Sequence, residues 1–218
     1  MLSLTAASLF GIIIYPGVEP IDLGGTAGVL SMATRILPNV RYTTIAHRAG
    51  PIGLSGGLIV QAGHAIADAP PCDVVIVCGG PGWPEAAADP ALLRYLGGLQ
   101  PTGIASVCTG ALILAAAGVL GGRAATTRRR AACQETEPPL HRLSANRDIR
   151  PIEAAVVDDG VVTSGGVSLA IDATLFLLGR LYGDPAAAKI AELIEYDRAY
   201  AANRAALGHA LPADPSGN

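Results

Sequence analysis

The most informative stretch of the chain is Gly103-Ile-Ala-Ser-Val-Cys-Thr-Gly-Ala-Leu-Ile-Leu-Ala-Ala-Ala-Gly118. A short apolar run stops at Cys108-Thr109-Gly110 and resumes as an Ala- and Leu-rich run, which predicts a strand, a sharp turn and a helix. Such a turn raises one side chain above the end of a sheet, beside unpaired N–H groups of the helix start. Cys108 is therefore a candidate nucleophile, and the positive helix end is expected to favour its thiolate. The alternative is a small buried cysteine at a tight turn.

Composition indicates a compact α/β protein and disfavours several other classes. Half of the 218 residues are apolar, 15% are charged, 4% are aromatic, and the formal net charge is −3. These values argue against general binding of polyanions such as nucleic acid. No apolar run approaches the roughly 20 residues of a membrane span, and no basic residue precedes the N-terminal apolar segment. The four cysteines form no Cys-x-x-Cys pair, so neither a zinc site nor a disulfide framework is indicated, and we expect a cytoplasmic protein.

Alternating patterns along the chain predict the fold. Apolar, β-branched runs indicate buried strands, an Asp-Gly turn at 158–160 indicates a hairpin, and Ala- and Leu-rich segments indicate helices. This alternation predicts a doubly wound, mostly parallel sheet sandwiched by helices, of flavodoxin-like type, with a small β-hairpin excursion at 55–63. We expect one domain over 1–210 and a disordered tail at 211–218. The expected strands are 9–15, 41–46, 74–78 and 124–127, and the expected helices are 90–99, 110–118, 168–182 and 185–196.

Two other strand ends carry candidate site residues. Glu19 and Asp22 lie in a turn-rich loop after the first strand, ahead of a short helix through Met32. A carboxylate at the carboxyl end of a parallel strand is a candidate acid or base, although a helix-capping role is the alternative. Gly79-Gly80-Pro81-Gly82 follows the strand at 74–78 and is either an ordinary turn or a source of backbone N–H groups for an anion.

Four segments, in this order, resemble the DJ-1/PfpI superfamily within the class I glutamine amidotransferase-like fold. The first runs from Tyr15-Pro16 to Ile21-Asp22-Leu23 and the second is Cys78 to Gly82; the third is Ser106 to Gly110, and the last is Thr163 to Val167 with Ala170-Ile171-Asp172. The elbow, with the later Ala125-Thr126-Thr127 and Ile194-Glu195-Tyr196, is similar to the isonitrile hydratase branch. It also resembles amidase-like domains of some transcription regulators.

The resemblance implies roles for individual residues. Cys108 would be the nucleophile, Asp22 the carboxylate that reaches its sulfur, and Thr109 a neighbouring hydrogen-bonding residue. Backbone N–H groups of Gly79, Gly80 and Thr109 would stabilise an anion. The family also implies a homodimer that acts on a small molecule without a cofactor or metal ion.

The sequence departs from the family pattern at two places. Arg128 follows Thr126-Thr127 where related sequences carry a histidine, and none of His47, His64, His141 and His209 occupies an obvious substitute position. This weakens a peptidase or amidase assignment, which needs a proton donor for the leaving amine. Leu23-Gly24-Gly25 also replaces the usual Leu-Thr-Gly-Pro in a loop expected to line the pocket. We therefore regard Gly24, Gly165 and Arg128 as candidate substrate-binding residues. Arg128 would bind a carboxylate group of the substrate, with an exposed or structural arginine as the alternative.

The resemblance leads to a ranked set of functions. The first is a hydro-lyase that adds water to an isonitrile through a Cys108 thioimidate, with Asp22 as proton donor. The second is a related enzyme that acts on another small electrophile, such as an α-oxoaldehyde or a biosynthetic intermediate. The third is a non-catalytic redox or small-molecule sensing module, without nucleic-acid binding by this polypeptide because no basic helix-turn-helix segment is evident.

Overall fold

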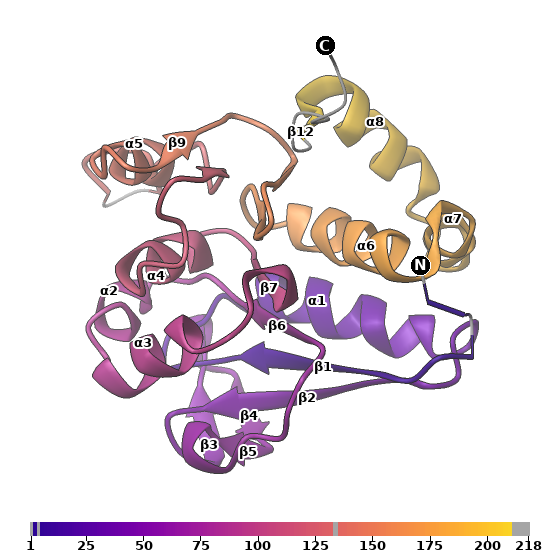
Figure 1. The fold of residues 1–218 in the computed structure, drawn as a ribbon, viewed down its shortest axis with the longest axis horizontal. Helices are drawn as coiled ribbons and strands as arrows, with labels where there is room; N and C mark the ends of the chain where they lie inside the picture. Colours follow the sequence, from indigo (N-terminus) through magenta and orange to yellow (C-terminus); the bar gives the residue numbers. More distant parts are fainter. Residues whose placement is uncertain (1, 4, 133–134, 211–218) are drawn as a thin grey trace.

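The computed structural model describes residues 2–3, 5–132 and 135–210, and within them twelve strands and eight α-helices (Figure 1). The strands are β1 (Ser8–Ile13), β2 (Val40–Ala46), β3 (Gly50–Gly53), β4 (Ile59–Ala62), β5 (His64–Ala65), β6 (Val74–Val77), β7 (Ile104–Ser106), β8 (Ala124–Ala125), β9 (Arg150–Pro151), β10 (Val156–Asp158), β11 (Val162–Ser164) and β12 (His209–Ala210). The helices are α1 (Pro20–Ala33), α2 (Trp83–Ala86), α3 (Pro90–Gly97), α4 (Gly110–Ala116), α5 (Pro139–Ser144), α6 (Leu169–Tyr182), α7 (Asp184–Leu193) and α8 (Asp197–Leu207). The tail predicted at 211–218 lies outside the described residues.

The main sheet has the predicted doubly wound topology. Its strand order is β12-β10-β11-β7-β6-β1-β2-β5, and its centre, β2-β1-β6-β7-β11, is parallel throughout. This is the order 2-1-3-4-5 of flavodoxin-like folds, in which ligands bind beyond the carboxyl ends of the strands. The apolar runs identified in the sequence form its buried interior, since every residue of β6 is at most 1% exposed. The predicted α/β fold is confirmed.

Two hairpins and one helix cap were also predicted from the sequence. The β10–β11 hairpin around Asp158-Asp-Gly160 is antiparallel, as the Asp-Gly turn indicates. The predicted excursion is a hairpin of β3 and β4, which begins at Gly50, before the segment that we had assigned to it. Asp89 caps α3 as expected, accepting hydrogen bonds from the N–H groups of Ala91 and Leu92.

The first helix begins earlier than the sequence suggested. We expected a loop through Thr26, whereas α1 starts at Pro20 and places Asp22 in its first turn. Proline is favoured at a first helical position because its missing N–H has no intrahelical partner there, and its fixed φ suits the helix. Gly24, Gly25 and Gly28 concealed this start, since glycine is a poor helix former. Asp22 is therefore positioned by a regular helix.

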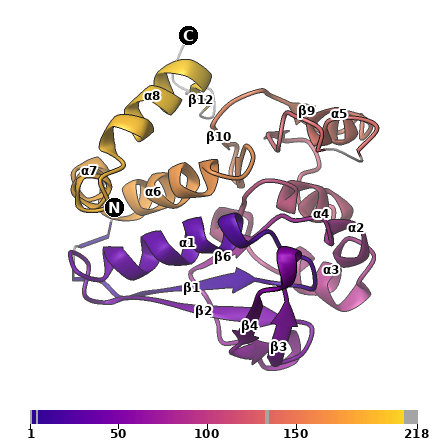
Figure 2. The same ribbon diagram turned by 180° about the vertical axis from the view of Figure 1, so that it is seen from behind.

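Helices α1, α6 and α7 pack together, and α2, α3 and α4 form a second group (Figures 1 and 2). Ser168 precedes α6 as predicted, but within the described structure its side chain makes no capping hydrogen bond. The helix predicted from Pro185 ends at Leu193, and α8 follows it as an element that the sequence did not reveal. Among the described residues, no helix combines the length and the apolar character needed to cross a membrane.

Candidate active site

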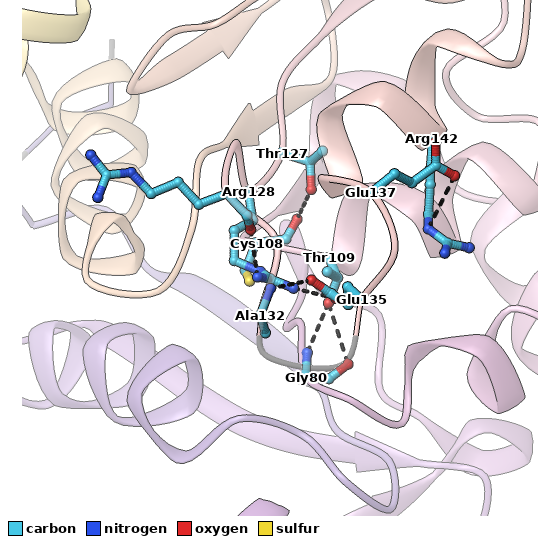
Figure 3. Close-up of polar contacts among 10 residues, drawn as sticks. Gly80, Cys108, Thr109, Thr127, Arg128, Ala132, Glu135, Glu137 and Arg142 are labelled. Atoms are coloured by element: carbon cyan, nitrogen blue, oxygen red, sulfur yellow. Dashed lines mark hydrogen bonds and ion pairs between the residues drawn. The ribbon is translucent and has the colours of Figure 1, made fainter.

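The candidate site lies where the carboxyl ends of β1, β6 and β7 meet. Asp22 follows β1, Gly79 and Gly80 follow β6, and Cys108 follows β7, so the topology brings together residues far apart in sequence. A pocket of about 500 Å³ opens there, and Figure 3 shows part of its wall. The described residues that line it are Glu19, Gly80, Pro81, Cys108, Thr109, Arg128, Ala132, Glu135 and Val167.

The turn at Cys108 is a sharp elbow between β7 and α4. Cys108 has a φ of 53°, in the left-handed region that non-glycine residues seldom adopt. A side chain on Gly110 would approach the carbonyl oxygen of Val77 to 2.1 Å, so the chain turns this tightly only with glycine there. The Cys108 N–H donates to the Gly165 carbonyl at 3.1 Å, and Thr127 Oγ1 donates to the Cys108 carbonyl at 2.6 Å. These bonds fix the backbone of a residue in a strained conformation.

Asp22 is fully buried with one oxygen bonded and one free. Its Oδ2 accepts a hydrogen bond from the N–H of Gly79 at 3.0 Å, and its Oδ1 finds no hydrogen-bond partner among the described residues. A side chain on Gly79 would lie 2.8 Å from Oδ2 and 2.5 Å from the Thr109 nitrogen, so glycine permits this approach. Burial raises the pKa of Asp22 from 3.8 to about 7, against the lowering effects of the neighbouring Cys108 thiol and of the Gly79 N–H.

The thiol of Cys108 does not have the low pKa that the helix start suggested. Burial first, and then the charge of Asp22, raise its pKa to about 12. Backbone N–H groups of Val167 and Thr109 and the charge of Arg128 lower it, but by less. The expectation of a thiolate favoured by the helix end is therefore wrong for the resting site, because burial and the Asp22 carboxylate outweigh the lowering effect of the backbone N–H groups.

The expected anion-binding amides are mostly engaged within the protein. Thr109 Oγ1 accepts from the Gly80 N–H at 2.9 Å, and Asp22 takes the Gly79 N–H. These bonds position Asp22 and Thr109, so neither glycine directs a free N–H at the pocket in this structure. The N–H groups of Thr109 and Val167 are the backbone donors that lower the pKa of the Cys108 thiol. Any developing negative charge near the sulfur is thus closest to Thr109 and Val167.

Arg128 lies in the pocket wall, at the position where the family resemblance led us to expect a histidine. Its Nη2 forms an ion pair with Glu135 Oε1, and its Nη1 donates to the carbonyl of Arg130 at 2.6 Å. Figure 3 shows the guanidinium next to the sulfur of Cys108, and the charge of Arg128 lowers the pKa of that thiol. Within the described residues no histidine lines this pocket, and His47 is instead bonded to Asp89 at 2.7 Å.

Two candidate residues lie away from the pocket. Gly24 is exposed on α1 and does not line the pocket. It lies two residues after Asp22, and two helical steps rotate a residue by about 200°, so Gly24 faces the opposite side of the helix. Gly165 supports the elbow through its carbonyl and lines a separate cavity beside Arg128. Conversely, sequence reasoning missed Val167 and Glu135. The Gly165-Gly166 pair before a helix was a signal for the special backbone of Val167, whose φ is 53°, whereas Glu135 had no signal.

No resident metal site is indicated in the described part of the chain. It contains no group of three or more His, Cys, Asp or Glu side chains placed to hold a metal ion. The groups present around Cys108 are an acid that holds its proton near neutral pH, a thiol, a guanidinium and two backbone N–H donors. Together they suit covalent addition of sulfur to a small electrophile with proton transfer from a carboxyl group.

Three kinds of comparison relate this chain to known proteins. The chain is 32% identical over 189 residues to an isonitrile hydratase of Pseudomonas putida, covering 85% of this chain and 77% of that protein. It is 29% identical over 188 residues to the HTH-type transcriptional regulator CdhR of Pseudomonas aeruginosa, covering 84% of this chain but 53% of the regulator. A crystal structure of a ThiJ/PfpI family protein from Pseudomonas syringae superposes with a TM-score of 0.76 at 26% identity, covering 89% of this chain and 77% of that one. Residues 11–179 match the DJ-1/PfpI family, to which this chain belongs.

Proposed function

We propose that the protein is a cofactor-independent cysteine enzyme that hydrates an isonitrile to an N-formamide. The observation that carries this proposal is the pairing of Cys108 with Asp22, a buried carboxyl group whose pKa is raised to about 7. Such a group both accepts a proton from a thiol and returns it at neutral pH. The similarity to an isonitrile hydratase supports the choice of substrate.

The reaction begins with attack by sulfur. Asp22 takes the thiol proton as the Cys108 sulfur bonds to the terminal carbon of the isonitrile, and then delivers that proton to the same carbon. The product is a thioimidate, in which carbon holds one hydrogen, a C–S bond and a C=N bond. The unbonded Oδ1 of Asp22 is the oxygen available for this transfer, since Oδ2 is held by Gly79.

Water completes the reaction. It adds to the thioimidate carbon, one of its protons moves to nitrogen, and collapse of the adduct breaks the C–S bond. The sulfur leaves with the remaining proton, which regenerates the thiol and releases the N-formamide. The N–H groups of Thr109 and Val167 stabilise charge on sulfur in both the addition and the departure.

This chemistry needs no histidine, unlike amide hydrolysis. An amidase must protonate a leaving amine, and histidine is the usual donor. In the described pocket the corresponding position holds Arg128, which does not release its proton at working pH. The hydration reaction expels no amine, because the nitrogen stays bonded to the product carbon. The single proton relay through Asp22 is therefore sufficient.

The proposal is tested by incubating the protein with a panel of alkyl and aryl isonitriles and measuring N-formamide. We expect turnover by the unmodified protein, loss of turnover in Cys108→Ala, and retention in the control Cys72→Ala, whose thiol lies outside the pocket. In Asp22→Asn we expect turnover to fall with no adduct on Cys108, because Asp22 is needed to form the thioimidate, whereas rapidly quenched unmodified protein should carry an adduct equal in mass to the isonitrile. No turnover on any member of the panel contradicts the substrate assignment.

A second candidate function is sensing, because the chain is also similar to a transcription regulator of which it spans about half the length. Oxidation by peroxide requires an accessible thiolate, whereas burial raises the pKa of Cys108 to about 12. Measuring the peroxide reactivity of Cys108 beside turnover distinguishes a redox sensor from an enzyme. Action on a different electrophile is distinguished by the mass trapped on Cys108. The proposal treats residues 1–210 as one domain of a cytoplasmic homodimer that acts on a small molecule.

A further inference from the structure

We propose that Arg128, held in place by Glu135, is a fixed cation that stabilises the negative charge of the Cys108 sulfur during attack. This assigns Arg128 to the nucleophile and not to a carboxylate group of the substrate. The inference rests on the proposed role of Cys108 as nucleophile, but it does not depend on which electrophile is attacked.

The Arg128 side chain is fixed along its whole length. A Cβ atom at Gly166 would lie 2.5 Å from Arg128 Cγ and 2.9 Å from both Cβ and Cδ, so the arginine stem packs directly on that glycine. At the far end, Nη2 pairs with Glu135 and Nη1 donates to the Arg130 carbonyl at 2.6 Å. The side chain is 16% exposed. This arrangement leaves the guanidinium in one position beside the sulfur (Figure 3).

Glu135 is itself anchored by a second bond. Its Oε2 accepts from the Ala132 N–H at 2.6 Å, while Oε1 pairs with Arg128. Both carboxylate oxygens are therefore used inside the protein. A substrate carboxylate would compete with Glu135 for the positive charge of Arg128. The pair is better suited to holding a guanidinium against the thiol than to receiving an anionic ligand.

The charges around the sulfur explain why a cation is needed. Asp22 and Glu19 lie at the start of α1, whereas Tyr15 follows β1 and Cys78 follows β6. None of these side chains can carry a positive charge. Among the described residues lining the pocket, Arg128 is the one basic side chain. A guanidinium stays protonated throughout the working pH range, so it supplies charge without exchanging a proton. Proton transfer is then left to Asp22.

The proposal predicts opposite effects from two substitutions in the same ion pair. Arg128→Gln removes the cation, so the thiol pKa rises and alkylation of Cys108 slows about tenfold for each unit of that rise. Glu135→Gln keeps a side-chain oxygen that can accept the Arg128 hydrogen bond and removes the negative charge that offsets the guanidinium, so the thiol pKa falls and alkylation becomes faster. Arg128→Lys keeps the charge but loses the planar geometry and is expected to lie between Arg128→Gln and the unmodified protein. General structural damage would not produce changes of opposite sign.

The experiment measures iodoacetamide alkylation of Cys108 against pH by peptide mass spectrometry, with circular dichroism to verify folding. Arg129→Gln is the matched control, because Arg129 pairs with Glu153 and does not line the Cys108 pocket; its alkylation rate is expected to be unchanged. Equal or same-direction changes in Arg128→Gln and Glu135→Gln overturn the proposal. If Arg128→Gln does not fold, an unchanged or slower rate in Glu135→Gln overturns it.

A second measurement separates this role from carboxylate recognition. Sodium acetate is added during alkylation as a small carboxylate probe, and we expect no saturable protection of Cys108. Saturable protection that disappears in Arg128→Gln would assign Arg128 to ligand binding instead. Because neither measurement uses an isonitrile, absence of isonitrile turnover leaves this inference standing, and failure of this inference leaves the isonitrile assay unaffected.

Discussion

Asp22 and Asp172 are two fully buried aspartates with closely similar surroundings and different bonding. Each lies in the first turn of a fourteen-residue helix, α1 or α6, and burial raises the pKa of Asp22 to about 7 and that of Asp172 to about 6. Asp172 accepts from Tyr196 Oη at 2.9 Å and from Asn203 Nδ2 at 3.1 and 3.3 Å. Asp22 has one bonded oxygen, one oxygen without a partner in the described structure, and a thiol beside it.

The difference separates a structural carboxyl group from a reactive one. A buried polar group is retained for stability when all its hydrogen-bonding capacity is used, and leaving part of it unused costs free energy. Asp172 meets that condition and ties α6 to α8, whereas Asp22 keeps an unused oxygen next to Cys108. A raised pKa alone does not distinguish the two residues. The free oxygen and the neighbouring sulfur do.

The largest expected difference is in catalysis. Asp22→Asn removes the proton relay and is expected to lower kcat for isonitrile hydration by about 10² to 10⁴, while Asp172→Asn leaves kcat near that of the unmodified protein. Formamide production by the two variants, with folding verified by circular dichroism, measures this contrast. Comparable losses in both variants would show that the comparison does not identify the reactive residue.

The pH dependence of stability gives the next largest effect. Both native pKa values lie above the ordinary 3.8, so between about pH 4 and pH 7 the native state binds more protons than the unfolded state. The free energy of unfolding therefore falls as pH rises through this window. Asp22→Asn has no titrating carboxyl group at this position, so its unfolding free energy should fall less as pH rises. The difference from the unmodified protein is expected to be on the order of 4 kcal/mol at pH 8. Urea unfolding at pH 5 and pH 8 provides the measurement, and an unchanged slope in the variant would contradict it.

Removing the bonded carboxylate should destabilise the protein. Asp172→Ala leaves the Tyr196 hydroxyl and the Asn203 amide without their acceptor and is expected to cost about 3 kcal/mol of unfolding free energy at pH 7. Asp22→Ala loses only the Gly79 bond and should cost less, or stabilise the protein, at the same pH. Denaturant unfolding of the two alanine variants side by side sharpens the comparison; the reverse order would break it.

The smallest effect concerns one hydroxyl group in the Asp172 cluster. Tyr196→Phe removes the hydrogen bond to Asp172 and is expected to lower the unfolding free energy by about 1 kcal/mol without changing kcat. Tyr42→Phe, at an exposed tyrosine, is the matched control and should have no measurable effect on thermal unfolding. A fall in kcat with Tyr196→Phe would connect the cluster to the active site.

The parts of the site that were predictable are those encoded locally. A strand, a Cys-Thr-Gly turn and an Ala-rich helix follow one another in sequence, so the elbow at Cys108 was readable from adjacent residues. The meeting of Asp22, Gly79 and Cys108 followed from the rule that parallel strands end at one edge. The helical setting of Asp22 was missed because three glycines weighed more heavily than Pro20.

Interactions between distant segments were not predictable in the same way. Arg128 was a candidate for the pocket, but its partner Glu135 lies in an irregular segment whose path no periodicity indicates. The cluster of Asp172 with Tyr196 and Asn203 depends on α8, which has no buried residue and therefore no apolar stripe to identify it. The thiol pKa depended on burial, a property of the folded chain that opposed the helix-end effect.

The pairing of β12 with β10 has a consequence for association between chains. A strand at the edge of a sheet presents unpaired N–H and C=O groups that other chains can bind. Here His209 and Ala210 pair with Val156 and Val157, and His209 also packs against the rings of Phe176 and Tyr200. Two residues, held by aromatic contacts, thus shield β10 from the solvent. Loss of this short strand would expose the edge of β10, and we expect chains to associate there edge to edge.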